Sequence, residues 1–175
     1  MARAIYRGLV ESGFPAENIG VVDPSEAAQS AARASGLIRI AESATDADLS
    51  ADLIVLAVKP QITGIALSPL AHRISSTTTV LSIIAGINSA SLANLLGLPN
   101  DDAVVRSMPN TPALVGEGMT GLFSNSAQRA HGRVLAERVV SAVGQCVWVS
   151  NESDLDLVTA ISGSGPAYFF LFMES

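Results

Sequence analysis

Two of the positions best suited to hold a phosphate-bearing ligand come directly after aliphatic runs of the sequence. Lys59-Pro60 follows the run Leu53–Val58, and Ala85-Gly86 follows the run Thr78–Ile84. In an open parallel sheet, ligands bind beyond the carboxyl ends of the strands. An ammonium group there could meet a phosphate or ribose oxygen, and small residues would let a flat ring approach the backbone. A solvated lysine and an ordinary strand-to-helix turn are the alternative interpretations.

Asp23 ends a third aliphatic run, Ile19–Val22. In dinucleotide-binding folds, an acidic residue after the second strand hydrogen-bonds the ribose 2′-hydroxyl of the adenosine. The same carboxylate could instead cap the helix that we expect over Pro24–Ser35, because aspartate is a preferred capping residue. Both roles are compatible only if the two carboxylate oxygens are divided between them.

A fourth candidate is the stretch Pro109–Gly118, which has two prolines and two glycines in ten residues. This composition predicts a rigid, tightly turned loop, and loops of this length in compact domains are disproportionately functional. Asn110 and Thr111 supply an amide and a hydroxyl that could hold a polar substrate against a cofactor ring. As structure alone, the loop would be a rigid connector.

Other chemistries find little support. His72 and His131 are far apart and lack metal-ligand spacing, so we predict no metal site. Cys146 lies in the apolar run Cys146–Val149 and is better explained as a core residue than as a nucleophile.

The elements that must position these residues alternate between two kinds of segment. Short aliphatic runs predict five strands, over Ile19–Val22, Leu53–Val58, Thr78–Ile84, Ala103–Val105 and Val147–Val149. Between them, helical spacing predicts helices over Pro24–Ser35, Gln61–Ile74, Ser89–Leu95 and Ala127–Val143. Such alternation indicates an α/β fold with a mostly parallel sheet. Because Leu53–Val58 is apolar at every position, we expect that strand inside the sheet with helices on both faces.

The two ends of the chain are unusual for this architecture. Ala2, Ile5, Leu9 and Val10 share one helical face, so a helix opens the chain where the sheet would need a strand. Near the other end, the break Ser162–Pro166 precedes an aromatic helix beginning at Ala167. We expect its apolar face to require further sequence or a partner subunit.

Composition excludes several classes of protein. Hydrophobic residues make up 49% and charged residues 15% of the 175 positions, which is incompatible with intrinsic disorder. With a net charge of −6, the chain lacks the overall positive charge that would attract nucleic acid or an anionic membrane surface. A single cysteine excludes an internal disulfide, and no signal peptide or membrane-spanning run was found. We therefore expect a cytoplasmic protein that binds neither nucleic acid nor membranes.

Four motifs in order resemble pyrroline-5-carboxylate reductase. They are Ala57-Val58-Lys59-Pro60-Gln61, Ser82-Ile83-Ile84-Ala85-Gly86, Arg106-Ser107-Met108-Pro109-Asn110-Thr111-Pro112 and Ser162-Gly163-Ser164-Gly165-Pro166-Ala167-Tyr168. The resemblance covers essentially the whole chain. It implies reduction of the cyclic imine pyrroline-5-carboxylate to L-proline with NADPH or NADH, in a homodimer or a higher oligomer.

The resemblance also implies a domain organisation. Residues 1–150 would form a Rossmann domain that lacks the first strand and the Gly-x-Gly loop, and residues 151–175 would begin a helical dimerisation domain. Met1-Ala2 would correspond to the last two positions of the glycine turn. The chain is then expected to be an inactive fragment whose proton donor lies outside it, and the loss of the first strand should leave two neighbouring strands unpaired.

Site residues carry over from the family only at matching positions. Those implied to contact the cofactor are Met1, Ala2, Asp23, Val58, Lys59, Pro60, Ala85, Gly86 and Asn110. Those implied to contact the substrate are Asn110, Thr111 and Glu152. The carboxylate of Asp23 stands where the family often has a small polar residue near the 2′-phosphate, which favours NADH over NADPH.

Two other interpretations remain open on the sequence. One is a non-catalytic α/β module that binds nucleotides or serves only a structural role. The other is a Rossmann reductase of the β-hydroxyacid dehydrogenase type, which would need a catalytic lysine in its later helices.

Overall fold

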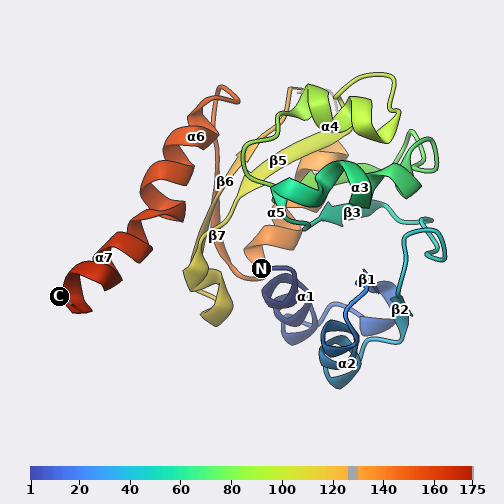
Figure 1. The fold of residues 1–175 in the computed structure, drawn as a ribbon, viewed down its shortest axis with the longest axis horizontal. Helices are drawn as coiled ribbons and strands as arrows, with labels where there is room; N and C mark the ends of the chain where they lie inside the picture. The colour runs from blue at the N-terminus through green and yellow to red at the C-terminus, as the bar shows by residue number, and fades with distance from the viewer. Residues whose placement is uncertain (126–129, 175) are drawn as a thin grey trace.

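The computed structural model describes residues 1–125 and 130–174, which form two β-sheets with helices packed around them (Figure 1). The smaller sheet pairs β1 (Gly20–Val22) with β2 (Arg39–Ala41) in parallel. The larger sheet has the strand order β3-β4-β5-β6-β7. Its strands are β3 (Leu53–Leu56), β4 (Thr79–Ser82), β5 (Val104–Met108), β6 (Gly118–Phe123) and β7 (Gly144–Trp148).

All neighbouring strands run parallel except β5 and β6, which are antiparallel. This arrangement confirms the predicted α/β class with a mostly parallel sheet. The main helices are α1 (Ala2–Glu11), α2 (Glu26–Ala34), α3 (Thr63–Leu67), α4 (Ser89–Leu96), α5 (Ala130–Ser141), α6 (Asp154–Val158) and α7 (Gly165–Glu174). Short 3₁₀ turns η1 (Ala16–Asn18), η2 (Pro60–Ile62), η3 (Ser68–Leu70) and η4 (Thr111–Val115) connect them, and η5 (Thr159–Gly163) is a π-helix.

The position predicted for Leu53–Val58 inside the sheet is wrong, because β3 forms one edge of the larger sheet. β1 likewise has a partner on only one side among the described residues, since the smaller sheet contains β1 and β2 alone. The two unpaired edges are those expected from the family resemblance. An apolar run shows that both faces of a strand are covered, but it carries no information about the strand's hydrogen-bonding neighbours.

α1 joins the two sheets and lies between them (Figure 1). Ala4 and Ile5 pack with Val55 of β3, whereas Tyr6 packs into the cluster around the smaller sheet with Ile40 of β2. Gly8, one helical turn after Ala4, lies so close to the end of α5 that a Cβ atom there would be 2.3 Å from the carbonyl oxygen of Ala142.

Two strands were not predicted. β2 contains only three residues, and β6 follows directly after the glycine-rich stretch Pro109–Gly118. Two glycines within β6 lower its strand propensity, and its pairing with β5 and β7 compensates for this. The predicted loop itself is tightly turned, as expected, because it contains η4 and leads into β6.

The helix predicted over Gln61–Ile74 is also wrong. The structure divides this stretch into η2, α3 and η3, and the chain leaves helical geometry at Ala71. Pro69 cannot donate a helical hydrogen bond, which explains the interruption. His72 then adopts a left-handed φ of 60° and its N–H donates to the carbonyl of Leu96 at 3.0 Å.

The break predicted at Ser162–Pro166 is instead a π-helical segment within a continuous helix from Asp154 to Glu174. An extra residue per turn accommodates Gly163, and Pro166 lies in the first turn of α7, where a missing N–H is tolerated. This helix extends away from the sheets (Figure 1). Its 21 residues are long and apolar enough to cross a membrane by length and composition alone, and 6% of an 18-residue apolar stretch within it is buried.

Candidate functional site

The carboxyl ends of β3, β4 and β5 meet at one edge of the larger sheet. Their register pairs Leu56 with Ser82 and Ser82 with Arg106. Lys59 and Ala85 each lie three positions beyond a paired residue, and Asn110 lies four positions beyond Arg106. The sheet therefore brings these three predicted residues to a common edge, which we call the carboxyl shelf.

The N-terminal turn of α1 adjoins the carboxyl shelf. Ala4 and Ile5 pack with Ile83, just past β4, and with Ala113 in η4, just past β5. Met1 is the N-cap of α1 and its side chain makes no capping hydrogen bond. The first turn contains no acidic side chain, so its backbone N–H groups present the positive end of the helix dipole near this edge. Met1 and Ala2, both exposed, thus lie beside the predicted strand-end residues.

Lys59 is exposed three residues after the end of β3, where it precedes η2. Its backbone carbonyl accepts a hydrogen bond from the Thr63 hydroxyl at 3.2 Å, which anchors the turn while leaving the ammonium group outside it. Val58 is half-buried against the apolar cluster under β3 and β4, and Pro60 opens η2. Lys59 is the only lysine of the chain, so it supplies the ammonium charge at this edge.

Ala85 and Gly86 follow β4 in a turn that leads to α4. Gly86 has a left-handed φ of 74°, and a Cβ atom built there would meet nothing within 4 Å. The turn therefore requires glycine for its backbone conformation, and the space beside it is open. An open, small-residue turn at this edge can admit a planar ring close to the backbone.

Asp23 follows β1 and forms a turn that precedes α2, whose N-cap is Ser25. Its Oδ1 accepts a hydrogen bond from the Ser25 N–H at 2.9 Å, and its carbonyl accepts one from the Gln29 side chain at 2.9 Å. The predicted capping role is therefore wrong, because the helix begins two residues later than expected and Asp23 Oδ1 bonds to the N-cap residue instead of to the first turn of α2. Contact with a ribose hydroxyl stays a prediction for this residue.

Asn110 uses both ends of its side-chain amide within the protein. Nδ2 donates to the Ser162 hydroxyl at 2.9 Å, and Oδ1 accepts from the Met119 N–H at 3.0 Å. Thr111, which begins η4, is exposed. The loop therefore lies at the carboxyl shelf, as predicted, but the amide that was expected to meet a ligand is bonded to the C-terminal segment.

Glu152 accepts hydrogen bonds from two elements, α4 and β5, which the sequence analysis did not connect with it. Its Oε1 accepts from the N–H of Ser89, the first residue of α4, at 2.6 Å, and from Nη1 of Arg106 at 3.2 Å. Contact between Glu152 and substrate stays a prediction, and the observed contacts join α4 and β5 to the segment before α6. The sequence did contain a signal for an ion pair here. An arginine within an apolar strand is expected to be buried, and a buried cation requires an anionic partner.

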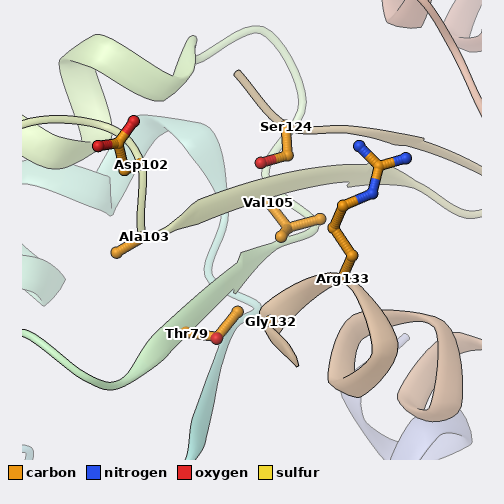
Figure 2. Close-up of a pocket in the computed structure, with 7 residues that line it drawn as sticks. All are labelled: Thr79, Asp102, Ala103, Val105, Ser124, Gly132 and Arg133. Atoms are coloured by element: carbon orange, nitrogen blue, oxygen red, sulfur yellow. The ribbon is translucent and has the colours of Figure 1, made fainter. Parts of the chain in front are cut away.

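Two hollows lie among the larger sheet and the helices around it. One is lined by Thr79, at the start of β4, by Ala103, just before β5, and by Arg133 of α5, and it has no room for a water molecule (Figure 2). A second, of about 330 Å³, lies between the ends of α1 and α5, next to Phe14 and Arg138. The first hollow therefore lies at the amino edge of β4 and β5, opposite the carboxyl shelf. The second lies at the end of α5, which leads into β7 on the side of the sheet where β5 ends, because β6 and β7 run antiparallel to β5.

Among the described residues, the ionisable group with a shifted pKa also lies off the shelf. The backbone N–H and hydroxyl of Ser50 lower the pKa of Asp48, and the guanidinium of Arg39, 2.7 Å away, adds to the effect. No group of three or more metal-ligating side chains occurs in the described ranges 1–125 and 130–174.

Comparison with known proteins gives matches along the whole chain. Residues 1–86 match the family model described as NADP oxidoreductase coenzyme F420-dependent, and residues 152–175 match the model of pyrroline-5-carboxylate reductase dimerisation. The pyrroline-5-carboxylate reductase of Haemophilus influenzae is 43% identical over 175 residues, which are 100% of this chain and 64% of that protein.

Solved structures agree with these matches. The pyrroline-5-carboxylate reductase of Coxiella burnetii superposes with a TM-score of 0.88 at 36% identity, covering 99% of this chain and 64% of that one. The Plasmodium falciparum enzyme, solved with NADP bound, has a TM-score of 0.81 at 31% identity, covering 98% and 62%. The chain thus spans just under two thirds of the length of these relatives.

Proposed function

We propose that this chain, which is similar to the pyrroline-5-carboxylate reductases from end to end, supplies the cofactor-binding part of such an enzyme. In this proposal residues 1–150 are the dinucleotide-binding domain and residues 151–175 begin the dimerisation domain. The reaction is the reduction of 1-pyrroline-5-carboxylate to L-proline with NADPH or NADH. The observation that carries the proposal is the shared carboxyl shelf of Lys59, Ala85 and Asn110.

The residues of the shelf fit a pyridine dinucleotide. The uncapped first turn of α1, at Met1 and Ala2, suits a pyrophosphate, because helix N-termini present free N–H groups to anions. The Lys59 ammonium adds a positive charge, and the open turn at Gly86 leaves space for a ring. Asp23 stands after β1, where a ribose hydroxyl is bound in related folds.

When bound, the reduced nicotinamide supplies a hydride to the imine carbon while a proton reaches the ring nitrogen. The chain's own contribution is to orient the cofactor and the imine, since the hard chemistry belongs to the cofactor. The Ala85-Gly86 turn and the loop at Asn110 and Thr111 would hold the two partners together, with Glu152 as a further substrate contact. The residue that gives the proton is not assigned to this chain.

The partner in this proposal is a second copy of the chain. Residues 152–175 match the dimerisation model, and the aromatic side chains of α7 are exposed around the helix, as shown by Tyr168 at 69% and Phe172 at 79%. A helix that is apolar on all sides must be covered by protein or lipid. The match to a dimerisation model favours protein. A cytoplasmic location stays a prediction.

Isothermal titration of the 175-residue chain with NADPH and with NADH tests the proposal directly. We expect at least one of them to bind in a 1:1 ratio. The Lys59→Ala variant should bind about tenfold more weakly or worse, because a charge-assisted contact to phosphate is worth roughly 1.5–3 kcal/mol. The Arg7→Ala variant, which removes an exposed cation paired with Glu11 on α1, is the matched control and should bind like the parent chain.

The outcomes separate the rival interpretations. If neither dinucleotide binds, the chain is a structural α/β module and the proposal fails. If Lys59→Ala and Arg7→Ala bind equally well, the site is not at the carboxyl shelf. The β-hydroxyacid dehydrogenase alternative is not favoured, because the matches along the chain are to pyrroline-5-carboxylate reductases.

A further inference from the structure

Residues 104–110, which we call the β5 segment, comprise β5 and the two residues after it. Three side chains of the β5 segment contact residues 152–163, near the C-terminus. Arg106, Met108 and Asn110 are spaced two residues apart, and Asn110 continues the extended backbone with φ −125° and ψ 171°. In extended chain, residues two apart point to the same face. The intervening Ser107 instead donates its hydroxyl to the Ser82 carbonyl of β4 at 2.9 Å.

Each of the three meets the segment at a different point. Arg106 pairs with Glu152, before α6, and Asn110 donates to Ser162, in the π-helix. Between them, the methyl group of Met108 lies against Gly163, where a Cβ atom would be 2.6 Å away. The β5 segment therefore holds both ends of α6–η5 in a defined register.

We infer that Asn110 is a positioning residue, which holds Ser162 and the turn into α7 at the carboxyl shelf instead of contacting the dinucleotide itself. Both ends of the side-chain amide already have a protein partner, because Oδ1 accepts from the Met119 N–H and Nδ2 donates to the Ser162 hydroxyl. These two bonds fix the amide between β6 and the π-helix, although each end could make one further hydrogen bond. This inference revises the direct cofactor contact implied for Asn110 by the family resemblance. The part that concerns the dinucleotide rests on the proposed function, whereas the contact with Ser162 does not.

The structural part is tested by hydrogen exchange of the backbone amides of residues 159–165 in the full 175-residue chain. Asn110→Ala and Ser162→Ala each remove the same hydrogen bond, so both should speed exchange there by about tenfold. Asn110→Asp should restore protection, because its carboxylate still accepts from Met119 N–H and can also accept from the Ser162 hydroxyl. Asn94→Ala, at an exposed position of α4, is the matched control and should leave exchange unchanged.

The functional part is tested by titrating the same variants with NADPH and with NADH. If Asn110 acts through Ser162, then Asn110→Ala and Ser162→Ala should change affinity equally, within twofold. A fivefold or greater loss in Asn110→Ala alone would show a direct contact and overturn the inference. Unchanged exchange at residues 159–165 in Asn110→Ala would also overturn it. If the parent chain binds no dinucleotide, the proposed function fails, while the exchange experiment still decides the role of Asn110.

Discussion

Arg106 is a charged side chain that the larger sheet buries, and its environment explains why Glu152 matters. The Arg106 side chain is 9% exposed and that of Glu152 is 25% exposed, with 3.2 Å between Nη1 and Oε1. The same carboxylate oxygen accepts from the N–H of Ser89 at the start of α4. Removing the carboxylate therefore leaves both a buried guanidinium and a helix N–H without their partner.

We expect Glu152→Ala to lower the free energy of unfolding by about 2–3 kcal/mol, measured by urea denaturation at pH 7. Breaking a fully buried pair costs roughly 3–5 kcal/mol, and the partial exposure of Glu152 reduces that figure. Glu152→Gln should lose less, because its amide oxygen can still accept from Ser89.

The control for this measurement is Glu11→Ala, which breaks the exposed pair with Arg7 on α1. Exposed pairs contribute roughly 0–1 kcal/mol. If Glu152→Ala were no more destabilising than Glu11→Ala, the Arg106–Glu152 contact would not stabilise the fold as argued.

Asp23 gives a second prediction at the scale of one residue, which concerns the choice of cofactor. A carboxylate next to a 2′-phosphate is repelled by it, so Asp23→Ser should shift the ratio of NADPH to NADH affinity about tenfold toward NADPH. Ser25, the N-cap residue of α2, is unchanged in this variant, so the helix should be retained. Titration of both dinucleotides supplies the ratio, and a change below twofold would place the phosphate elsewhere.

At the scale of elements, α1 determines how the two sheets are joined. It packs on the larger sheet through Ile5 and on the smaller one through Tyr6, and at Gly8 it approaches α5 closely. A Cβ atom at position 8 would lie 2.3 Å from the Ala142 carbonyl oxygen, which is backbone and cannot rotate away. The contact between α1 and α5 therefore depends on the absence of a side chain.

Gly8→Ala should accordingly destabilise the chain by about 1–3 kcal/mol, as overpacking usually does. Gly64→Ala in α3 is the matched control, because nothing lies within 4 Å of a Cβ atom there. Alanine is the better helix former, so this control should be neutral or stabilising by up to about 1 kcal/mol. Equal effects of the two substitutions in thermal or urea unfolding would contradict the close approach of α1 and α5.

At the scale of the whole molecule, the exposed helix α7 determines how the chain associates with a partner (Figure 1). Phe169 is 72% exposed and Phe172 is 79% exposed, and they lie three residues apart on one face of α7. Burying each of them in a partner is worth roughly 1.5–3 kcal/mol. Self-association through this helix should therefore be strong and sensitive to charge.

We expect the chain to self-associate in sedimentation experiments, and the double substitution Phe169→Asp with Phe172→Asp to weaken association at least a hundredfold. Val134→Asp introduces the same charge at another exposed apolar position, on α5, and should leave association unchanged. Partition of the parent chain into lipid vesicles without self-association would instead assign the helix to a membrane.

Much of this architecture was predictable from local pattern. The aliphatic runs that became β3, β4 and β5 mark where strands end, and parallel strands align their carboxyl ends. For that reason the sequence alone predicts that Lys59, Ala85 and Asn110 share one edge of the sheet. The edge position of β3, the strand β6 and the π-helix at Thr159–Gly163 were not predicted, because each depends on the neighbours that an element acquires.

By itself, the sequence determined the α/β class, the positions along the chain of the strands that build the carboxyl shelf, and the motifs that lie on it. Only the tertiary structure decided which side chains on the shelf are free and which are already bonded. Asn110 meets Ser162 across 52 positions and Arg106 meets Glu152 across 46, and no periodicity extends over such distances. Hydrogen bonds of this kind exist only after packing brings distant segments together, so their partners cannot be identified from local composition.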